Sequence, residues 1–123
     1  MAKKVLLVDD SNTTLMMEQM ILQQLTPYEC ITARDGIDAL SRAMKEIPDL
    51  VLMDVVMPRM NGFEACKRMR LEDTLRDTPI ILVTTRGEKE YMEAGFHSGC
   101  NNYITKPINS NELVTLLQSY LGK

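Results

Sequence analysis

The sequence has no long hydrophobic run and no block of basic residues. Its apolar stretches fall far short of the ~20 residues that a membrane-spanning helix needs. The short apolar run after Lys4 cannot form the core of a signal peptide. Lysine and arginine are scattered and the formal net charge is -3, which argues against nonspecific binding to nucleic acid or to a membrane surface. We therefore expect a soluble cytoplasmic protein with no membrane insertion and no direct nucleic-acid contact.

Cysteine and histidine are also scarce. Cys30, Cys66 and Cys100 are widely spaced, no CxxC motif occurs, and His97 is the single histidine. This pattern argues against a disulfide framework and against a zinc site, so we expect three reduced thiols and a histidine with a surface or capping role. The patterns GxxxxGK[ST] and GxGxxG are absent as well, which argues against the common nucleotide-binding loops.

The sequence instead alternates regularly between strand and helix signals. Strand character is found at 5–8, 29–33, 50–53, 80–83 and 103–105. Helical spacing or polar caps follow at 11–25, 35–46, 63–70 and 88–97, and beyond Asn109. Five such units predict one α/β domain over residues 1–123, in which helices cover both faces of a parallel sheet. With 45% hydrophobic residues, the chain can form one sizeable core.

The character of the strands also predicts their order. The segments 5–8, 50–53 and 80–83 are continuously apolar, as is typical of strands that are buried on both faces. The segments 29–33 and 103–105 include polar residues and therefore suit the edges. The order 2-1-3-4-5, with strands numbered along the chain, satisfies both conditions.

Polar side chains follow four of these strands, at the point where each strand ends. Asp9 and Asp10 follow the first strand, Asp54 the third, Thr84 the fourth and Lys106 the fifth. Ligand sites of open parallel sheets lie beyond the carboxyl ends of the strands, so these side chains should converge. Two carboxylates ~4 Å apart repel by about 4 kcal/mol at an effective dielectric constant of 20, so three of them need a cation or a proton. Because Mg²⁺ takes oxygen ligands and tolerates phosphate among them, the set predicts a site for Mg²⁺ and a phosphoryl group.

The helix predicted at 11–25 is rich in methionine. Met17, Met20, Ile21 and Leu25 follow helical spacing, and Met16 adjoins them. Methionine is an adaptable packing residue. We expect these methionines in the core or at the flank of the helix, and a partner-binding surface is the alternative.

Four short motifs give the sequence a family resemblance. They are Val8-Asp9-Asp10-Ser11, Met53-Asp54 followed by Met57-Pro58 and Asn61-Gly62, Val83-Thr84, and Tyr103-Ile104-Thr105-Lys106-Pro107. In this order and at these separations they resemble the receiver domain of two-component response regulators, similar to the stand-alone chemotaxis regulators. The resemblance covers essentially the whole chain. It implies a flavodoxin-like (βα)5 fold, for which the order 2-1-3-4-5 is known, and a phosphorylation switch rather than an enzyme with a separate substrate.

The resemblance also implies roles for the acids. Asp54 is the implied phosphoacceptor for a histidine kinase, a phosphotransfer protein or a small phosphodonor. Asp10 and Asp54 are implied ligands of Mg²⁺, with Asp9 acting largely through water. The backbone carbonyl of Val56 is a further implied ligand.

Phosphorylation is further implied to change a surface of the domain. Lys106, in an implied cis peptide bond with Pro107, and the hydroxyl of Thr84 would contact the phosphoryl oxygens. As Thr84 moves inward, Tyr103 is implied to turn from exposed to buried. This changes the face of the fourth helix, fifth strand and last helix, which the family uses for a downstream protein or a homodimer.

Several positions depart from the family pattern. Thr85 stands where many receivers have Ala or Gly, and we expect its bulk to narrow access to the phosphoacceptor. The resemblance implies that Val56 and Arg86 hold the two positions that flank the path of the attacking water. Neither residue offers an acid or an amide to orient that water, so we expect slow self-dephosphorylation. Leu15 replaces a common Arg, which we expect to affect surface recognition rather than chemistry.

Other classes of protein fit the sequence less well. The main alternative is a pseudo-receiver, an unphosphorylated interaction module, although all the acids and the lysine are present. A phosphatase with an aspartyl intermediate would need a second acid where Val56 stands, and more chain for a substrate cap. A flavin-binding protein would need a phosphate loop where Asp9 and Asp10 stand.

Overall fold

The structure is a computed structural model that describes residues 2–85 and 89–122. Within these residues five strands alternate with five α-helices. The strands are β1 (Lys4–Val8), β2 (Glu29–Ala33), β3 (Leu50–Asp54), β4 (Ile80–Thr84) and β5 (Asn102–Thr105). The helices are α1 (Asn12–Leu25), α2 (Gly36–Glu46), α3 (Gly62–Arg70), α4 (Lys89–His97) and α5 (Ser110–Leu121). A short 3-10 helix, η1 (Asp73–Leu75), was not predicted, because three residues are too few to show a helical period in the sequence.

The five strands form one parallel sheet in the order β2-β1-β3-β4-β5. This confirms the predicted order, with the continuously apolar strands in the centre. The register pairs Val8 of β1 with Met53 of β3, and Asp54 of β3 with Val83 of β4. The order switches direction between β1 and β3, and the carboxyl ends of these two strands therefore flank the expected ligand site.

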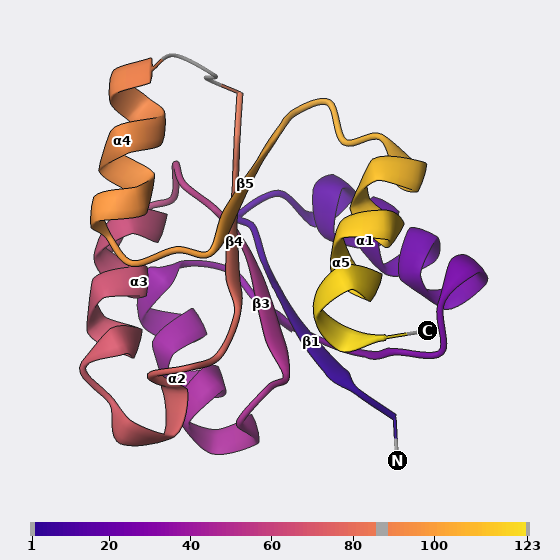
Figure 1. Ribbon diagram of the computed structural model, residues 1–123, viewed down its shortest axis with the longest axis horizontal. Helices are drawn as coiled ribbons and strands as arrows, with labels where there is room; N and C mark the ends of the chain where they lie inside the picture. The colour runs from indigo at the N-terminus through magenta and orange to yellow at the C-terminus, as the bar shows by residue number, and fades with distance from the viewer. Residues whose placement is uncertain (1, 86–88, 123) are drawn as a thin grey trace.

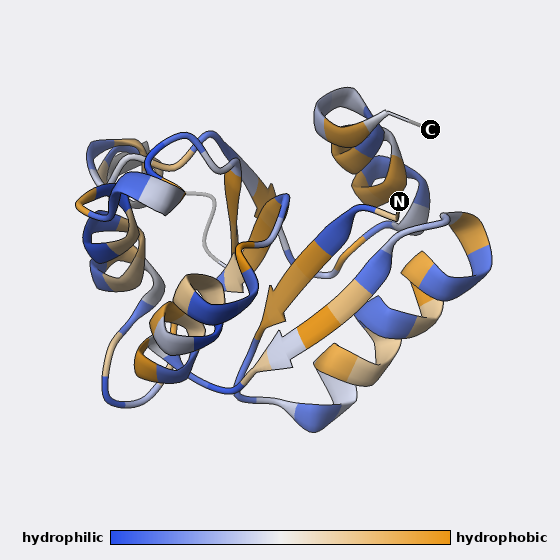
Figure 2. Cartoon of the chain, turned by 90° about the horizontal axis from the view of Figure 1, so that it is seen from below, coloured by the Kyte–Doolittle hydropathy of each residue, from blue (hydrophilic) through white to orange (hydrophobic). Residues whose placement is uncertain are grey.

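Helices cover both faces of the sheet (Figure 1). Helices α2, α3 and α4 lie on one face, and α1 and α5 lie on the other. Leu6 and Val8 of β1 belong to the core under α2 and α3, whereas Val5 and Leu7 belong to the core under α1 and α5, as the two-residue period of a strand requires. The central strands are accordingly hydrophobic along most of their length, while the helices alternate in character (Figure 2).

Polar caps begin four of the helices. The side chains of Ser11, Asp35, Asn61 and Asn109 each accept a hydrogen bond from the backbone N–H three residues further on. Each bond satisfies one of the free donors in the first helical turn. The caps at Ser11, Asp35 and Asn109 agree with the predicted starts of their helices, whereas Asn61 was named only as part of a family motif.

The methionines of α1 lie at the surface. Met16, Met17 and Met20 are 61%, 42% and 54% exposed, and Leu25 is also exposed. Of the two expected places, core or helix flank, the core is therefore excluded for these methionines. Of the predicted stripe in this described helix, Ile21 packs against the core.

The buried face of α1 is a different set of residues. Leu15, Glu18 and Leu22 point towards the sheet, at the i, i+3 and i+7 spacing of one helix face. Leu15 is 5% exposed and belongs to the core under α1 and α5. The prediction that Leu15 affects surface recognition is therefore wrong, because its side chain does not reach the surface.

The cysteines are free thiols. Cys66 and Cys100 are buried and Cys30 is partly buried, and burial raises the pKa of all three, that of Cys100 to about 11. His97 is exposed at the end of α4, as predicted. No helix in the described part of the chain is both long and apolar enough to cross a membrane.

Candidate functional site

Three acidic side chains meet at the carboxyl edge of the sheet. Asp9 and Asp10 directly follow β1, and Asp54 ends β3. One carboxylate oxygen from each residue lies within 4.8 Å of the other two. Asp9 and Asp54 are buried and Asp10 is exposed. The side-by-side pairing of β1 and β3 thus brings together acids that are far apart in the sequence, as was predicted from their positions at the ends of these strands.

Lys106 lies against the two buried acids. Its Nζ donates to Oδ2 of Asp9 at 3.1 Å and lies 3.4 Å from Oδ2 of Asp54. The residue follows β5 directly, and its peptide bond to Pro107 is cis, as predicted. The backbone N–H of Lys106 donates to the carbonyl of Thr84 at 2.7 Å, which ties the ends of β5 and β4 together at the site.

Burial and charge perturb the titration of this cluster. Burial raises the pKa of Asp54, the charge of Asp9 raises it further, and Lys106 opposes both effects. For Lys106, burial disfavours the charged form, but the hydrogen bond to Asp9 and the charges of both carboxylates prevail and raise its pKa. Carboxylate oxygens no more than 4.8 Å apart repel by at least about 3.5 kcal/mol at an effective dielectric constant of 20. One ammonium therefore leaves the three acids with excess negative charge, which favours a second cation.

The donor set fits a hard divalent cation such as Mg²⁺. It consists of carboxylate oxygens, and the exposure of Asp10 leaves access for the water ligands that Mg²⁺ retains. Asp9 already has protein partners on both oxygens, since Oδ1 accepts from the N–H of Ser11 at 2.9 Å and Oδ2 accepts from Lys106. This favours Asp10 and Asp54 as direct ligands and an indirect role for Asp9.

The remaining predicted residues surround the acids. Thr84 ends β4 and is buried. Val56 lies two residues beyond Asp54, with its side chain directed to solvent at 64% exposure, and Thr85 is exposed next to Thr84. Arg86 lies outside the described residues.

Tyr103 of β5 packs against α4. A Cβ added to Gly95 would lie 2.7 Å from Cε2 of the Tyr103 ring, and the ring centroids of Tyr103 and Phe96 are 6.4 Å apart. The residue is half-buried and its hydroxyl oxygen is shielded from solvent. The structure thus shows one position of this ring, half-buried against α4.

One buried acid near the site was not predicted. Glu18 of α1 is 2% exposed, and its Oε1 has no hydrogen-bond partner among the described residues. Burial raises the pKa of Glu18 to about 8, the charges of Asp9 and Asp54 add to the shift, and Lys106 opposes it. Its helical spacing from two buried leucines was the available signal in the sequence.

Comparisons with known proteins agree with this fold. Residues 5–118 match the response regulator receiver domain. The chain is 35% identical to the polar-differentiation response regulator DivK of Brucella anthropi, over 99% of this chain and 98% of that protein. It is similar to the structure of the chemotaxis protein CheY4 of Vibrio cholerae, with a TM-score of 0.92 and 38% identity over 98% of this chain and 99% of that one.

A third similar protein has a structure that contains a metal ion. The receiver domain of the sensor histidine kinase PA1611 from Pseudomonas aeruginosa has a TM-score of 0.91 and 29% identity over 100% of both chains, and that structure has a magnesium ion coordinated in its active site cleft. The family match and the relatives cover nearly all of this chain. The chain therefore belongs to the response regulator receiver domain family, the signalling switches of two-component systems.

Proposed function

We propose that this receiver domain is switched by phosphorylation of Asp54. The donor is a phosphohistidine of a sensor kinase or phosphotransfer protein, or a small phosphodonor, in the cytoplasm. The observation that carries the proposal is the convergence of three carboxylates within 4.8 Å, with the ammonium of Lys106 3.4 Å from Asp54. An interaction module that is never phosphorylated would have no need to bury two acids and a lysine together.

In the transfer step, Asp54 is the nucleophile. One of its carboxylate oxygens forms a P–O bond as the P–N bond of the phosphohistidine breaks, and the imidazole leaves with the electron pair. The carboxylate must be ionised to attack, and the positive charge of Lys106 favours that form against the effect of burial. Lys106 then pairs with the phosphoryl oxygens, and the hydroxyl of Thr84 donates to them once they are present. The domain modifies only itself and is no enzyme in the ordinary sense.

Asp10, Asp54 and the backbone carbonyl of Val56 are the proposed ligands of Mg²⁺, with Asp9 acting through water. Bound Mg²⁺ supplies positive charge that neutralises the phosphoryl oxygens. The all-oxygen donor set supports this assignment. So does the magnesium ion in the active site cleft of the PA1611 receiver domain.

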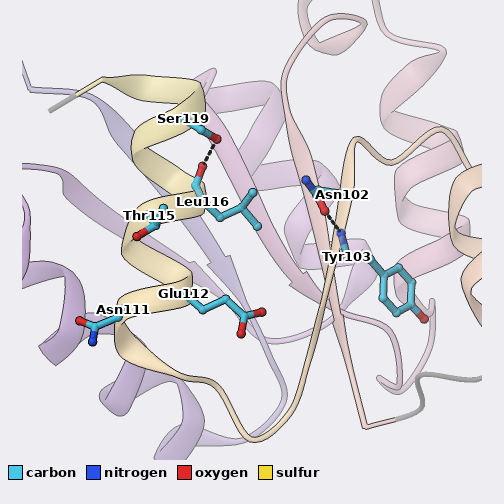
Figure 3. A pocket seen from close by; sticks show the side chains of 7 residues that line it. All are labelled: Asn102, Tyr103, Asn111, Glu112, Thr115, Leu116 and Ser119. Atoms are coloured by element: carbon cyan, nitrogen blue, oxygen red, sulfur yellow. Dashed lines mark hydrogen bonds between the residues drawn. The ribbon is translucent and has the colours of Figure 1, made fainter.

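The proposed output surface is the face of α4, β5 and α5. A groove of about 510 Å³ runs between β5 and α5 (Figure 3), lined by Asn102, Tyr103, Asn111, Glu112, Thr115, Leu116 and Ser119. The ring of Tyr103 points away from α5 in this view, towards its contact with Gly95 of α4. Since β4 and β5 are paired, with Thr84 beside Thr105, a movement of Thr84 is transmitted to this face. We expect a downstream protein or a second copy of the domain to bind there.

We also propose that the phosphorylated form is long-lived. The side chain of Val56 is exposed and apolar, so it cannot orient a water molecule towards the phosphoryl group. Thr85 and Arg86 are the other residues proposed to slow hydrolysis. Val56→Asn, which introduces a water-binding amide, should shorten the half-life of the phosphorylated form, and an unchanged half-life would contradict this role.

The decisive experiment is intact mass spectrometry after incubation with acetyl phosphate or phosphoramidate. We expect the mass of one phosphoryl group, dependent on Mg²⁺ and absent from Asp54→Asn. Asp73→Asn, which alters an exposed acid in η1, is the matched control and should be phosphorylated like the wild type. If no donor, including a phosphorylated histidine kinase, modifies the wild-type protein, the domain is a pseudo-receiver.

A further inference from the structure

The loop that follows Asp54 contains an unusual turn at Arg59. Arg59 has a φ of 66°, and the N–H of Met60 donates to the carbonyl of Pro58 at 2.8 Å across it. A hydrogen bond from i to i+2 around a residue of positive φ is characteristic of the classic γ-turn, which is rare and strained. A side chain other than glycine keeps such a conformation only when its surroundings hold it there.

Asp35, at the start of α2, holds Arg59 in this conformation. Nε and Nη2 of Arg59 lie 2.9 and 2.6 Å from Oδ2 of Asp35. The other oxygen of Asp35 accepts from the N–H of Asp38 at 2.8 Å, as the N-cap of α2. Asp35 is buried, and each of its two oxygens has a separate structural partner. The guanidinium of Arg59 is therefore tied to the start of α2, while 58% of the side chain is exposed.

Backbone contacts hold the loop on either side of the turn. The N–H of Gly36 donates to the carbonyl of Met60 at 3.1 Å, and the N–H of Gly62 donates to the carbonyl of Val55 at 2.9 Å. A Cβ on Gly36 would lie 2.3 Å from the carbonyl oxygen of Met60, and a Cβ on Gly62 would lie 2.5 Å from that of Asp54. The loop thus lies against α2 at Met60 and against the end of β3 at Gly62, and Val56 lies within the span that these contacts define.

We propose that Arg59 is a positioning residue for the metal site, which acts by holding the backbone carbonyl of Val56 in place through its pair with Asp35. The inference rests on the proposed function, in which that carbonyl is a ligand of Mg²⁺. Asp54 is placed by β3, whereas Val56 offers its oxygen from an irregular loop. The orientation of this ligand therefore depends on the γ-turn three residues later, and the γ-turn depends on the ion pair.

The test compares three substitutions of Arg59 by the dissociation constant for Mg²⁺, measured calorimetrically on the unphosphorylated protein. Arg59→Ala removes the pair and leaves a residue that disfavours positive φ, so we expect about tenfold weaker binding, as for other residues that orient a metal ligand. Arg59→Gly also removes the pair but accepts positive φ without strain, and it should recover part of the affinity. The phosphorylation rate at saturating Mg²⁺ should match the wild type in both, because the nucleophile is untouched.

Two further variants keep the result interpretable. Arg76→Ala removes an exposed arginine that pairs with Asp73 in η1, and it should leave the Mg²⁺ affinity unchanged. Arg59→Lys keeps the positive charge but lacks the geometry of the guanidinium, and it replaces Arg59→Ala in the comparison if that variant fails to fold. We expect its affinity for Mg²⁺ to be below that of the wild type as well. The inference is overturned if the folded Arg59 variants bind Mg²⁺ as tightly as the wild type, or if Arg76→Ala weakens binding equally. A wild-type protein that binds no Mg²⁺ overturns the proposed metal site itself, and this inference with it.

Discussion

The buried carboxyl of Glu18 predicts an unusual dependence of stability on pH. The side chain is 2% exposed, and burial raises its pKa from 4.5 to about 8, with the charges of Asp9 and Asp54 adding to the shift and Lys106 opposing it. In the unfolded chain the carboxyl loses its proton above pH 4.5, whereas the folded protein retains it up to about pH 8. Folding therefore takes up a proton in this range, and the free energy of unfolding falls as the pH rises through it.

The magnitude follows from the pKa difference. A pH of 7 lies about 2.5 units above the pKa of 4.5 in the unfolded chain, so the carboxyl is ionised there. Keeping it protonated in the folded protein costs about 1.36 kcal/mol of stability for each of these units. The buried carboxyl thus destabilises the metal-free protein by about 3 kcal/mol at pH 7. Glu18→Met replaces it with an apolar side chain of similar length, so the free energy of unfolding should rise by about 3 kcal/mol, or about 10 °C in Tm for a domain of this size.

The assay is urea unfolding of both proteins between pH 5 and 8, in EDTA so that no metal changes the charge of the cluster. The difference between Glu18→Met and the wild type should be below about 1 kcal/mol at pH 5 and should reach about 3 kcal/mol at pH 7. Glu93→Met removes an exposed carboxyl from α4 and should stay within about 0.5 kcal/mol of the wild type at pH 7. A difference that does not change with pH, or a Glu18→Met protein less stable than the wild type at pH 7, would refute the reasoning.

Three other substitutions test the packing and the charges of the fold. Lys106→Met leaves two buried carboxylates without their counter-ion, so the free energy of unfolding by urea in EDTA should fall by about 3–5 kcal/mol. Saturating Mg²⁺ should restore part of this stability. An unchanged free energy of unfolding would mean that the acids are better solvated than the structure indicates. Arg70→Ala removes a guanidinium that donates to the backbone carbonyls of Leu75, Thr78 and Gly99. The free energy of unfolding, measured by chemical denaturation, should fall by about 2–3 kcal/mol, against less than about 1 kcal/mol for the exposed Arg76→Ala. Leu15→Arg restores the residue common in the family at a buried position and should cost more than about 3 kcal/mol, so an unchanged Tm in a thermal melt would contradict the assignment of Leu15 to the core.

The sheet and the acid cluster were predictable because they follow from strand order alone. Continuous apolar runs identify the central strands, and residues directly after parallel strands must meet at one edge. Asp54 and Lys106 could therefore be brought together without any knowledge of side-chain contacts. The structure places them 3.4 Å apart.

The orientation of α1 could not be predicted in the same way. The helix carries apolar residues on more than one face, and the face of Leu15 and Leu22 has helical spacing just as the predicted face of Met17 and Ile21 does. The second face is the buried one, although it includes Glu18. Spacing identifies the faces of a helix, but the packing of the helix on the sheet selects between them.

The pair of Arg59 and Asp35 escaped prediction for another reason. It joins two loops that follow different strands. Asp35 was predicted only as a helix cap and Arg59 only lies inside the family motif, so neither signal pairs one residue with the other. Arginine is also an unexpected residue at a positive φ. A contact of this kind depends on the final geometry of both loops and has no periodic signal in the sequence.

The uniform direction of the strands has a practical consequence for protein engineering. Since all five strands run towards the site, every segment that returns from a helix re-enters the sheet at the opposite edge. The exposed stretch around Asp77, between η1 and β4, is one such segment. New termini or an inserted reporter domain at this edge would leave the strand ends that carry the acids and the lysine uninterrupted. The fold thus offers attachment points for building sensors on one side of the sheet, with the signalling chemistry kept on the other.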